Sequence, residues 1–303
     1  MGERPTAVPP TRYAADGGSG GATRGYSMRK TVLLAAAGVS LITISACNKQ
    51  ASVSGNASTQ TAAADAINGT WKADISSVQW ETKPDEYLLQ NGTYTCKSCT
   101  PPYSVAADGA FHPVNTPYFD SDSVKVVDAH TVTETSKKGD KQIGVGTTTI
   151  SADGNTSTTQ FTDTSAPGEP SKGEFSETRV GPAPAGAHAI SGQWKPSKLA
   201  NFNDAALTFT VNVSGDTYKS SSPDGTSYEA KIGGGDVPIS GDIAGTTVSV
   251  ARSGDNGYAV TRKRDGKVVG VTTYTVGADG KLKGVNENKQ NGSITRWSAD
   301  MQS

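Results

Sequence analysis

The chain has 303 residues and a formal net charge of −1, with 34% hydrophobic residues, 35 glycines, six phenylalanines and three methionines. A net charge so close to neutral gives no electrostatic signal of a nucleic-acid-binding protein. Many glycines and few large apolar side chains argue against a helical bundle and favour a β-rich fold with many turns.

Residues 28–46 have the layout of a secretory signal peptide. Arg29 and Lys30 form a short positive region, and an apolar stretch follows from Thr31 to Ile44. That stretch is too short to span a bilayer as a helix. The ending Ile44-Ser45-Ala46-Cys47 resembles the lipobox of bacterial lipoproteins, in which a peptidase cleaves before the cysteine and the cysteine carries a lipid.

This resemblance implies that Cys47 is the lipidation site of an exported protein, and that the lipid attaches it to a membrane. Asn48 follows the cysteine, which in lipoproteins favours sorting to the outer membrane, facing the periplasm. Cleavage would leave 257 of the 303 residues, which is room for two ordinary domains, with 23 basic and 27 acidic side chains.

Two segments outside the signal are too polar to form a core. Residues 1–27 are low in complexity and are predicted to be a disordered extension upstream of Met28. Residues 47–66 carry almost no large apolar side chain, so they are predicted to form a flexible tether between the lipid and the first domain.

From residue 67 onward, short matches indicate an internal repeat. Gly69-Thr70-Trp71-Lys72 matches Gly192-Gln193-Trp194-Lys195, and four further matches follow in order at offsets of 124 to 126 residues. One of them pairs Val124-Lys125-Val126 with Val248-Ser249-Val250. The matches predict two copies of one β unit, residues 67–180 and 190–303, joined by a linker at 181–189. Chance agreement between turns of a glycine-rich chain is the alternative.

Each copy is predicted to be a small antiparallel barrel or sandwich. Residues 207–213 alternate apolar and polar side chains, which is typical of a half-buried strand. Asn91-Gly92 between two strand-like segments predicts a type I′ hairpin turn. The same device is predicted at Asp153-Gly154, Asp265-Gly266, Asp279-Gly280 and Asn291-Gly292. Outside the signal no sustained helical period occurs, so helices are expected to be few and short.

Each copy also begins with Gly-x-Trp and ends with an arginine in its last predicted strand, which places Trp71 with Arg179 and Trp194 with Arg296. This arrangement resembles the lipocalin signature, in which a tryptophan of the first strand packs under an arginine of the last strand. The resemblance implies two Trp–Arg closing pairs and a small apolar ligand in a barrel mouth or between the repeats. Tryptophans that simply anchor the core of a β-sandwich are the alternative. The repeat as a whole is also similar to an uncharacterised group of Gly-Thr-Trp-Lys bacterial lipoproteins.

The segment that contains Cys96 and Cys99 is the strongest candidate for a chemically active site in the chain. In an exported protein two cysteines three residues apart predict a local disulfide. A thioredoxin-type redox pair needs a helix after the first cysteine, whereas Pro101-Pro102 follow here. A metal site would need His112 and His130 as further ligands, at a spacing too long for a zinc finger.

The sequence therefore predicts a non-catalytic cell-envelope lipoprotein with two tandem antiparallel β domains. No cofactor, metal centre or nucleic-acid partner is predicted, because the three histidines are widely spaced and no nucleophile elbow or phosphate loop occurs. The first functional hypothesis is a lipocalin-like binding module for a small apolar ligand. The alternatives are a structural lipoprotein that docks another envelope protein and a thiol–disulfide enzyme that uses Cys96 and Cys99.

Overall fold

A computed structural model of the chain describes residues 65–303. The predicted extension 1–27, the signal peptide 28–46 and the lipidation site Cys47 lie outside the described residues. Of the tether predicted at 47–66, the last two residues are described. One of them, Asp65, accepts hydrogen bonds from the Tyr258 hydroxyl and from Arg252 Nη1, so contacts with the β domains include a residue that precedes the predicted boundary.

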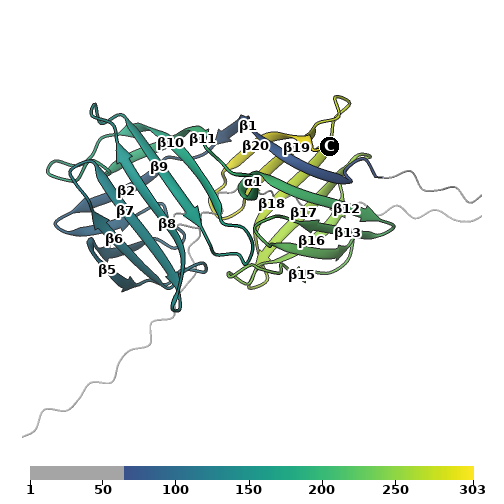
Figure 1. Cartoon of the computed structure of the whole chain (residues 1–303), viewed down its shortest axis with the longest axis horizontal. Coiled ribbons are helices and arrows are strands. Elements are labelled where there is room, and N and C mark those ends of the chain that lie inside the picture. Colours follow the sequence, from purple (N-terminus) through teal and green to yellow (C-terminus); the bar gives the residue numbers. More distant parts are fainter. Residues whose placement is uncertain (1–64) are drawn as a thin grey trace, which may run out of the picture.

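The described residues form two ten-stranded antiparallel sheets, each curled into a nearly closed barrel, as Figure 1 shows. This confirms the predicted all-β fold with two tandem antiparallel domains. The helix within this part of the chain is the single turn α1 (Asp204–Leu207), in agreement with the expectation of few and short helices. No helix among the residues described is long and apolar enough to cross a membrane.

We call the sheet with strand order β4-β3-β2-β11-β10-β9-β8-β7-β6-β5 the first barrel. Its strands are β2 (Asp85–Gln90), β3 (Thr93–Cys96), β4 (Tyr103–Ala106), β5 (Asp108–Pro113), β6 (Ser121–Val126), β7 (Thr131–Lys138), β8 (Lys141–Ile150), β9 (Thr156–Asp163), β10 (Ser171–Gly181) and β11 (Gly192–Ala200).

The second barrel has the strand order β14-β13-β12-β1-β20-β19-β18-β17-β16-β15. Its strands are β1 (Gly69–Glu81), β12 (Thr208–Ser214), β13 (Thr217–Ser221), β14 (Ser227–Lys231), β15 (Val237–Pro238), β16 (Thr247–Arg252), β17 (Gly257–Arg264), β18 (Lys267–Val276), β19 (Leu282–Asn288) and β20 (Ile294–Met301).

The two copies exchange their first strands. β1 lies between β12 and β20 in the second barrel, and β11 lies between β2 and β10 in the first. In Figure 1 the dark blue β1 is therefore found beside the yellow β20. The predicted units 67–180 and 190–303 consequently do not coincide with the barrels. In the connection between β1 and β2, Pro84 biases Lys83 toward extended backbone, which favours a chain that runs on into the other barrel over one that reverses.

Apart from this exchange, the strand order of one barrel repeats that of the other. The pairing register also gives the equivalent positions: the pair Tyr87–Cys96 corresponds to Val211–Ser220, at the predicted offset of 124. The match between residues 124–126 and 248–250 is wrong by two residues. Val124 pairs with Glu134 and Val250 pairs with Val260, so these strands are related by an offset of 126.

Two of the five dipeptides predicted to form type I′ hairpin turns have the backbone conformation of that turn. At Asn91-Gly92 both residues have positive φ, 51° and 72°, as a type I′ turn requires. Asp265-Gly266 behaves in the same way, with φ of 50° and 73°. At the other three dipeptides only the glycine has positive φ, so these turns are not type I′.

Candidate binding site

A tryptophan–arginine closing pair of the predicted kind is present in the first barrel, between Trp194 and Arg179. Trp194 is fully buried, and its indole Nε1 donates a hydrogen bond to the Ile190 carbonyl at 2.9 Å. The Arg179 guanidinium carbon lies 4.0 Å from the centre of the Trp194 ring. The guanidinium also donates hydrogen bonds of 2.6 to 2.7 Å to the carbonyls of Gly154, Ser191 and Ala189. The arginine therefore ties the last strand of one copy to the first strand of the other.

The partners predicted for the two tryptophans are wrong, because the copies exchange their first strands. Trp71 repeats the indole hydrogen bond, to the Ile67 carbonyl at 2.9 Å, but its register partner on β20 is Met301. Met301 thus occupies the place that Arg179 has opposite Trp194. Arg296 is paired in register with Gln79 instead, and its guanidinium contacts the Glu81 carboxylate.

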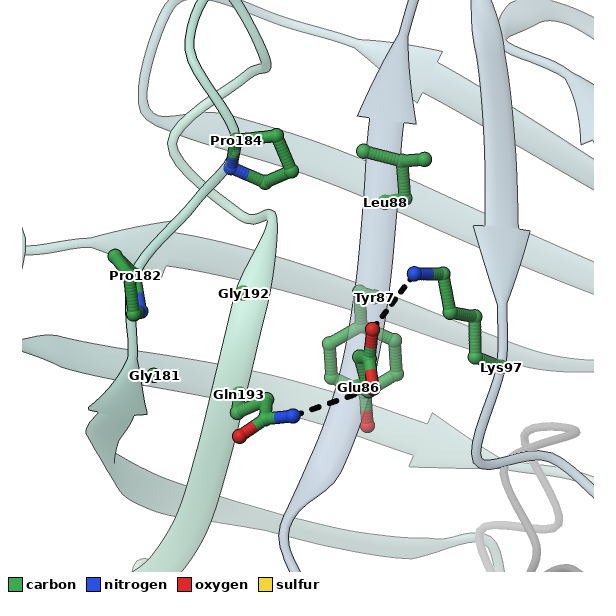
Figure 2. A pocket seen from close by; sticks show the side chains of 9 residues that line it. All are labelled: Glu86, Tyr87, Leu88, Lys97, Gly181, Pro182, Pro184, Gly192 and Gln193. Carbon is green, nitrogen blue, oxygen red and sulfur yellow. Dashed lines mark hydrogen bonds and ion pairs between the residues drawn. The ribbon is translucent and has the colours of Figure 1, made fainter.

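A shallow groove lies on the outer face of the first barrel, where the short pairing between β2 and β11 ends (Figure 2). At its floor the Glu86 carboxylate accepts hydrogen bonds from Lys97 Nζ at 2.6 Å and from Gln193 Nε2 at 3.3 Å. The bond from Lys97 lowers the pKa of Glu86. The groove has a volume of about 180 Å³, below the roughly 300–1,000 Å³ of typical ligand pockets, and its polar groups already bind one another.

The lumen of the second barrel is filled with apolar and aromatic side chains. Trp71, Tyr218, Tyr258 and Leu282 are all fully buried there. Ring centres of neighbouring aromatic residues lie 5.2 to 6.4 Å apart, in stacked, tilted and edge-to-face arrangements. These contacts give the second barrel the packed interior of a structural β-barrel.

The lumen of the first barrel holds buried carboxylates beside its apolar core. Asp122, Glu134 and Glu177 are only 1%, 4% and 1% exposed. Asp122 lies two residues before Val124 on β6, and Glu134 lies two residues after Val132 on β7. Residues two apart share one face of a strand, and both valines belong to the apolar core, so the carboxylates face the interior. The equivalent register positions of the second barrel hold Val248, Val260 and Ala299. The two barrels thus share a fold and differ in the chemistry of their interiors.

Hydroxyl groups and aromatic rings surround the Asp122 carboxylate. It accepts hydrogen bonds from the Tyr103 hydroxyl at 2.9 Å and from Ser136 Oγ at 3.0 Å. Burial raises the pKa of Asp122 to about 6, and burial together with the charge of Asp122 raises the pKa of Tyr103 well above its usual value. The Tyr103 ring lies 6.4 Å from Tyr94 and 5.8 Å from Phe119, both buried. The lumen therefore places an ionisable carboxyl group beside a cluster of three aromatic rings.

The predicted disulfide between Cys96 and Cys99 is present, with an S–S distance of 2.05 Å. Both residues are fully buried and pack in the core of the first barrel. In this form the two sulfur atoms are unavailable as thiolate ligands or nucleophiles. Among the residues described, no group of three or more histidine, cysteine, aspartate or glutamate side chains is arranged to hold a metal ion.

Replacing both Cys96 and Cys99 with serine should leave a folded protein with a slightly lower melting temperature. The bridge closes a loop far shorter than the 15-residue loop for which about 3 kcal/mol is expected, so its contribution should be smaller. In the second copy Ser220 and Pro223 stand at these places without a bridge. Calorimetry of oxidised, reduced and substituted protein measures the effect. Complete unfolding of the serine variant would show that the bridge is needed for folding.

The acidic lumen was not predicted from the sequence, although a signal for it exists. Asp122 and Glu134 occupy positions of period-two strand patterns whose neighbours on the same face are valines. When the two copies are aligned at the correct offset, Asp122 is equivalent to Val248 and Glu134 is equivalent to Val260. The offset chosen from the sequence was two residues too small at this point, so the comparison paired the wrong residues.

Comparisons of the chain with protein-family models, with curated proteins and with solved structures found no match.

Proposed function

We propose that the protein is a non-catalytic lipoprotein of the cell envelope, anchored through Cys47 in the outer membrane and facing the periplasm, that binds a small ligand in the lumen of the first barrel. One observation carries the ligand site: three lumen positions that hold apolar side chains in the second barrel hold buried carboxylates in the first. The anchor is supported by the apolar run that ends in Ile44-Ser45-Ala46-Cys47.

The chemistry of this lumen favours a cationic ligand with an apolar body, in place of the purely apolar ligand expected from the sequence. A positive charge that enters this lumen is attracted by carboxylates that are almost fully buried, where water screens charge weakly. Aromatic rings such as Tyr94, Tyr103 and Phe119 attract organic cations through their faces and pack against apolar groups. A small organic amine combines both properties.

The packed second barrel would then serve as a scaffold, which also agrees with the alternative of a structural lipoprotein that docks an envelope protein. The alternative of a thiol–disulfide enzyme is less well supported. Cys96 and Cys99 are fully buried, whereas a redox-active pair needs an accessible sulfur atom.

The ligand site is tested by replacing Glu134 with valine and Glu177 with alanine, the residues of the second barrel at these positions. We expect the double variant to lose binding of small aryl and alkyl amines by at least tenfold in calorimetric titration, because the compensating negative charge is gone. A version with both glutamates changed to glutamine keeps the side-chain shape if the apolar version fails to fold.

The matched control removes two exposed carboxylates and leaves the lumen unchanged: Asp140→Asn and Asp255→Asn. It should bind amines as the unaltered protein does, because long-range effects of net charge are screened by salt. Equal losses in both variants, or preferential binding of fatty acids by the unaltered protein, would contradict the cationic ligand.

The anchor is tested by Cys47→Ser. We expect the variant to remain uncleaved and to lose the lipid, because both steps act on the cysteine. Membrane fractionation together with intact mass measurement checks this. A processed protein of normal size that still fractionates with membranes would show that another feature attaches it.

A further inference from the structure

The strand that completes each barrel comes from the other copy. β1 pairs with β12 over Gly69–Lys72 and with β20 from Trp71 to Glu81. Both of these partners belong to the second copy. β11 in turn pairs with β10 and β2 of the first copy. Figure 1 shows the reciprocal crossing between the two barrels.

Side chains bind β1 in the slot between β12 and β20. The Thr70 and Thr210 hydroxyl oxygens lie 2.8 Å apart, and Asn68 Nδ2 donates to the Val213 carbonyl at 3.0 Å. Val213 N–H donates back to Asn68 Oδ1 at 2.5 Å. The fully buried Trp71 fills the interior side of the same slot. This combination of reciprocal amide hydrogen bonds and a buried indole fixes the register of an incoming strand.

The slot for β11 is built in the same way, with different side chains. Trp194 is its buried indole, and Arg179 of β10 covers the ring and binds the Ser191 and Ala189 carbonyls. Ser191 Oγ accepts a hydrogen bond of 2.9 Å from the Leu89 N–H of β2. Both slots therefore recognise a Gly-x-Trp strand of the partner copy.

Contacts away from the slots also join the copies. The N–H of Gly168 donates to the Asp224 carbonyl at 2.7 Å, and Arg264 Nη2 donates to the Tyr118 hydroxyl at 2.6 Å. A Cβ atom at Gly168 would come within 2.4 Å of the Pro223 carbonyl oxygen, so only glycine allows this approach.

We infer that the slot between β12 and β20 and the slot between β2 and β10 are interaction sites for a second copy of this repeat, and that the two copies bind each other without the covalent link between them. The chain then corresponds to a two-fold dimer with exchanged first strands whose subunits have become joined through residues 182–191. Exchange of an identical element is a common route to such dimers, because the strand makes the same contacts in either chain.

The experiment cuts this link in the folded, full-length protein. A protease site is inserted between Ala185 and Gly186, which are exposed. After cleavage we expect both fragments to elute together from a sizing column. Native mass spectrometry should show a complex that contains one copy of each fragment. Fragments that separate on cleavage under native conditions would overturn the inference.

A second measurement uses cysteines introduced at Thr70 and Thr210, which belong to different fragments after the cut. Oxidation should join the two fragments on a non-reducing gel, and the absence of this product would contradict the exchange. Trp71→Ala in the cleaved protein should weaken the complex at least a hundredfold, whereas Lys195→Ala, exposed on β11, should leave it unchanged. Equal effects of both substitutions would show that the slots do not carry the recognition.

Discussion

Trp194→Ala should destabilise the first barrel by about 3–5 kcal/mol, although the residue lies in the second copy of the sequence. The indole is fully buried between β2 and β10, and its removal leaves a large cavity in the lumen. It also removes the surface against which the Arg179 guanidinium packs. Denaturant unfolding measures the total loss, and amide hydrogen exchange shows where protection is lost.

The location of the loss distinguishes an exchanged from an unexchanged fold. We expect faster exchange in residues 85–181 for Trp194→Ala and in residues 208–301 for Trp71→Ala. Lys195→Ala, the exposed neighbour on β11, serves as the control and should change stability by no more than about 0.5 kcal/mol. Loss of protection confined to residues 208–301 in Trp194→Ala would contradict the strand exchange.

The second large effect concerns pH. The pKa of Asp122 is raised by burial to about 6, compared with roughly 3.9 in an unfolded chain. The folded state therefore binds this proton more tightly than the unfolded state. The resulting stabilisation is fully present below about pH 4 and is lost as the pH rises through 6, which amounts to about 3 kcal/mol.

Asp122→Asn should remove this dependence, because the amide does not ionise and its oxygen can still accept the hydrogen bond from Tyr103. Denaturant unfolding at several values between pH 4 and 7 should show a smaller decline for the variant than for the unaltered protein. Asp140→Asn, at an exposed position, is the control and should retain the decline. Identical pH profiles for Asp122→Asn and the unaltered protein would show that this carboxyl does not titrate in the predicted range.

Local features were predictable from the sequence, because they depend on residues close together in the chain. The alternation in residues 207–213 predicted a strand, and Asn91-Gly92 predicted a type I′ turn, since these two residues tolerate positive φ. The two cysteines predicted a disulfide from their number and spacing. The repeated Gly-x-Trp also indicated duplication, and both tryptophans make the same indole hydrogen bond.

The partners of the strands were decided only by the tertiary structure. Trp71 pairs with Phe209 and Met301, more than 130 residues away, and local propensity is the same whichever copy supplies the neighbouring strand. The position of Arg179 over Trp194 follows from that choice, and so does the pairing of Arg296 with Gln79 in place of Trp194. The acidic lumen depends on register as well, because a shift of two residues keeps every side chain on the same face and changes only which residues are equivalent.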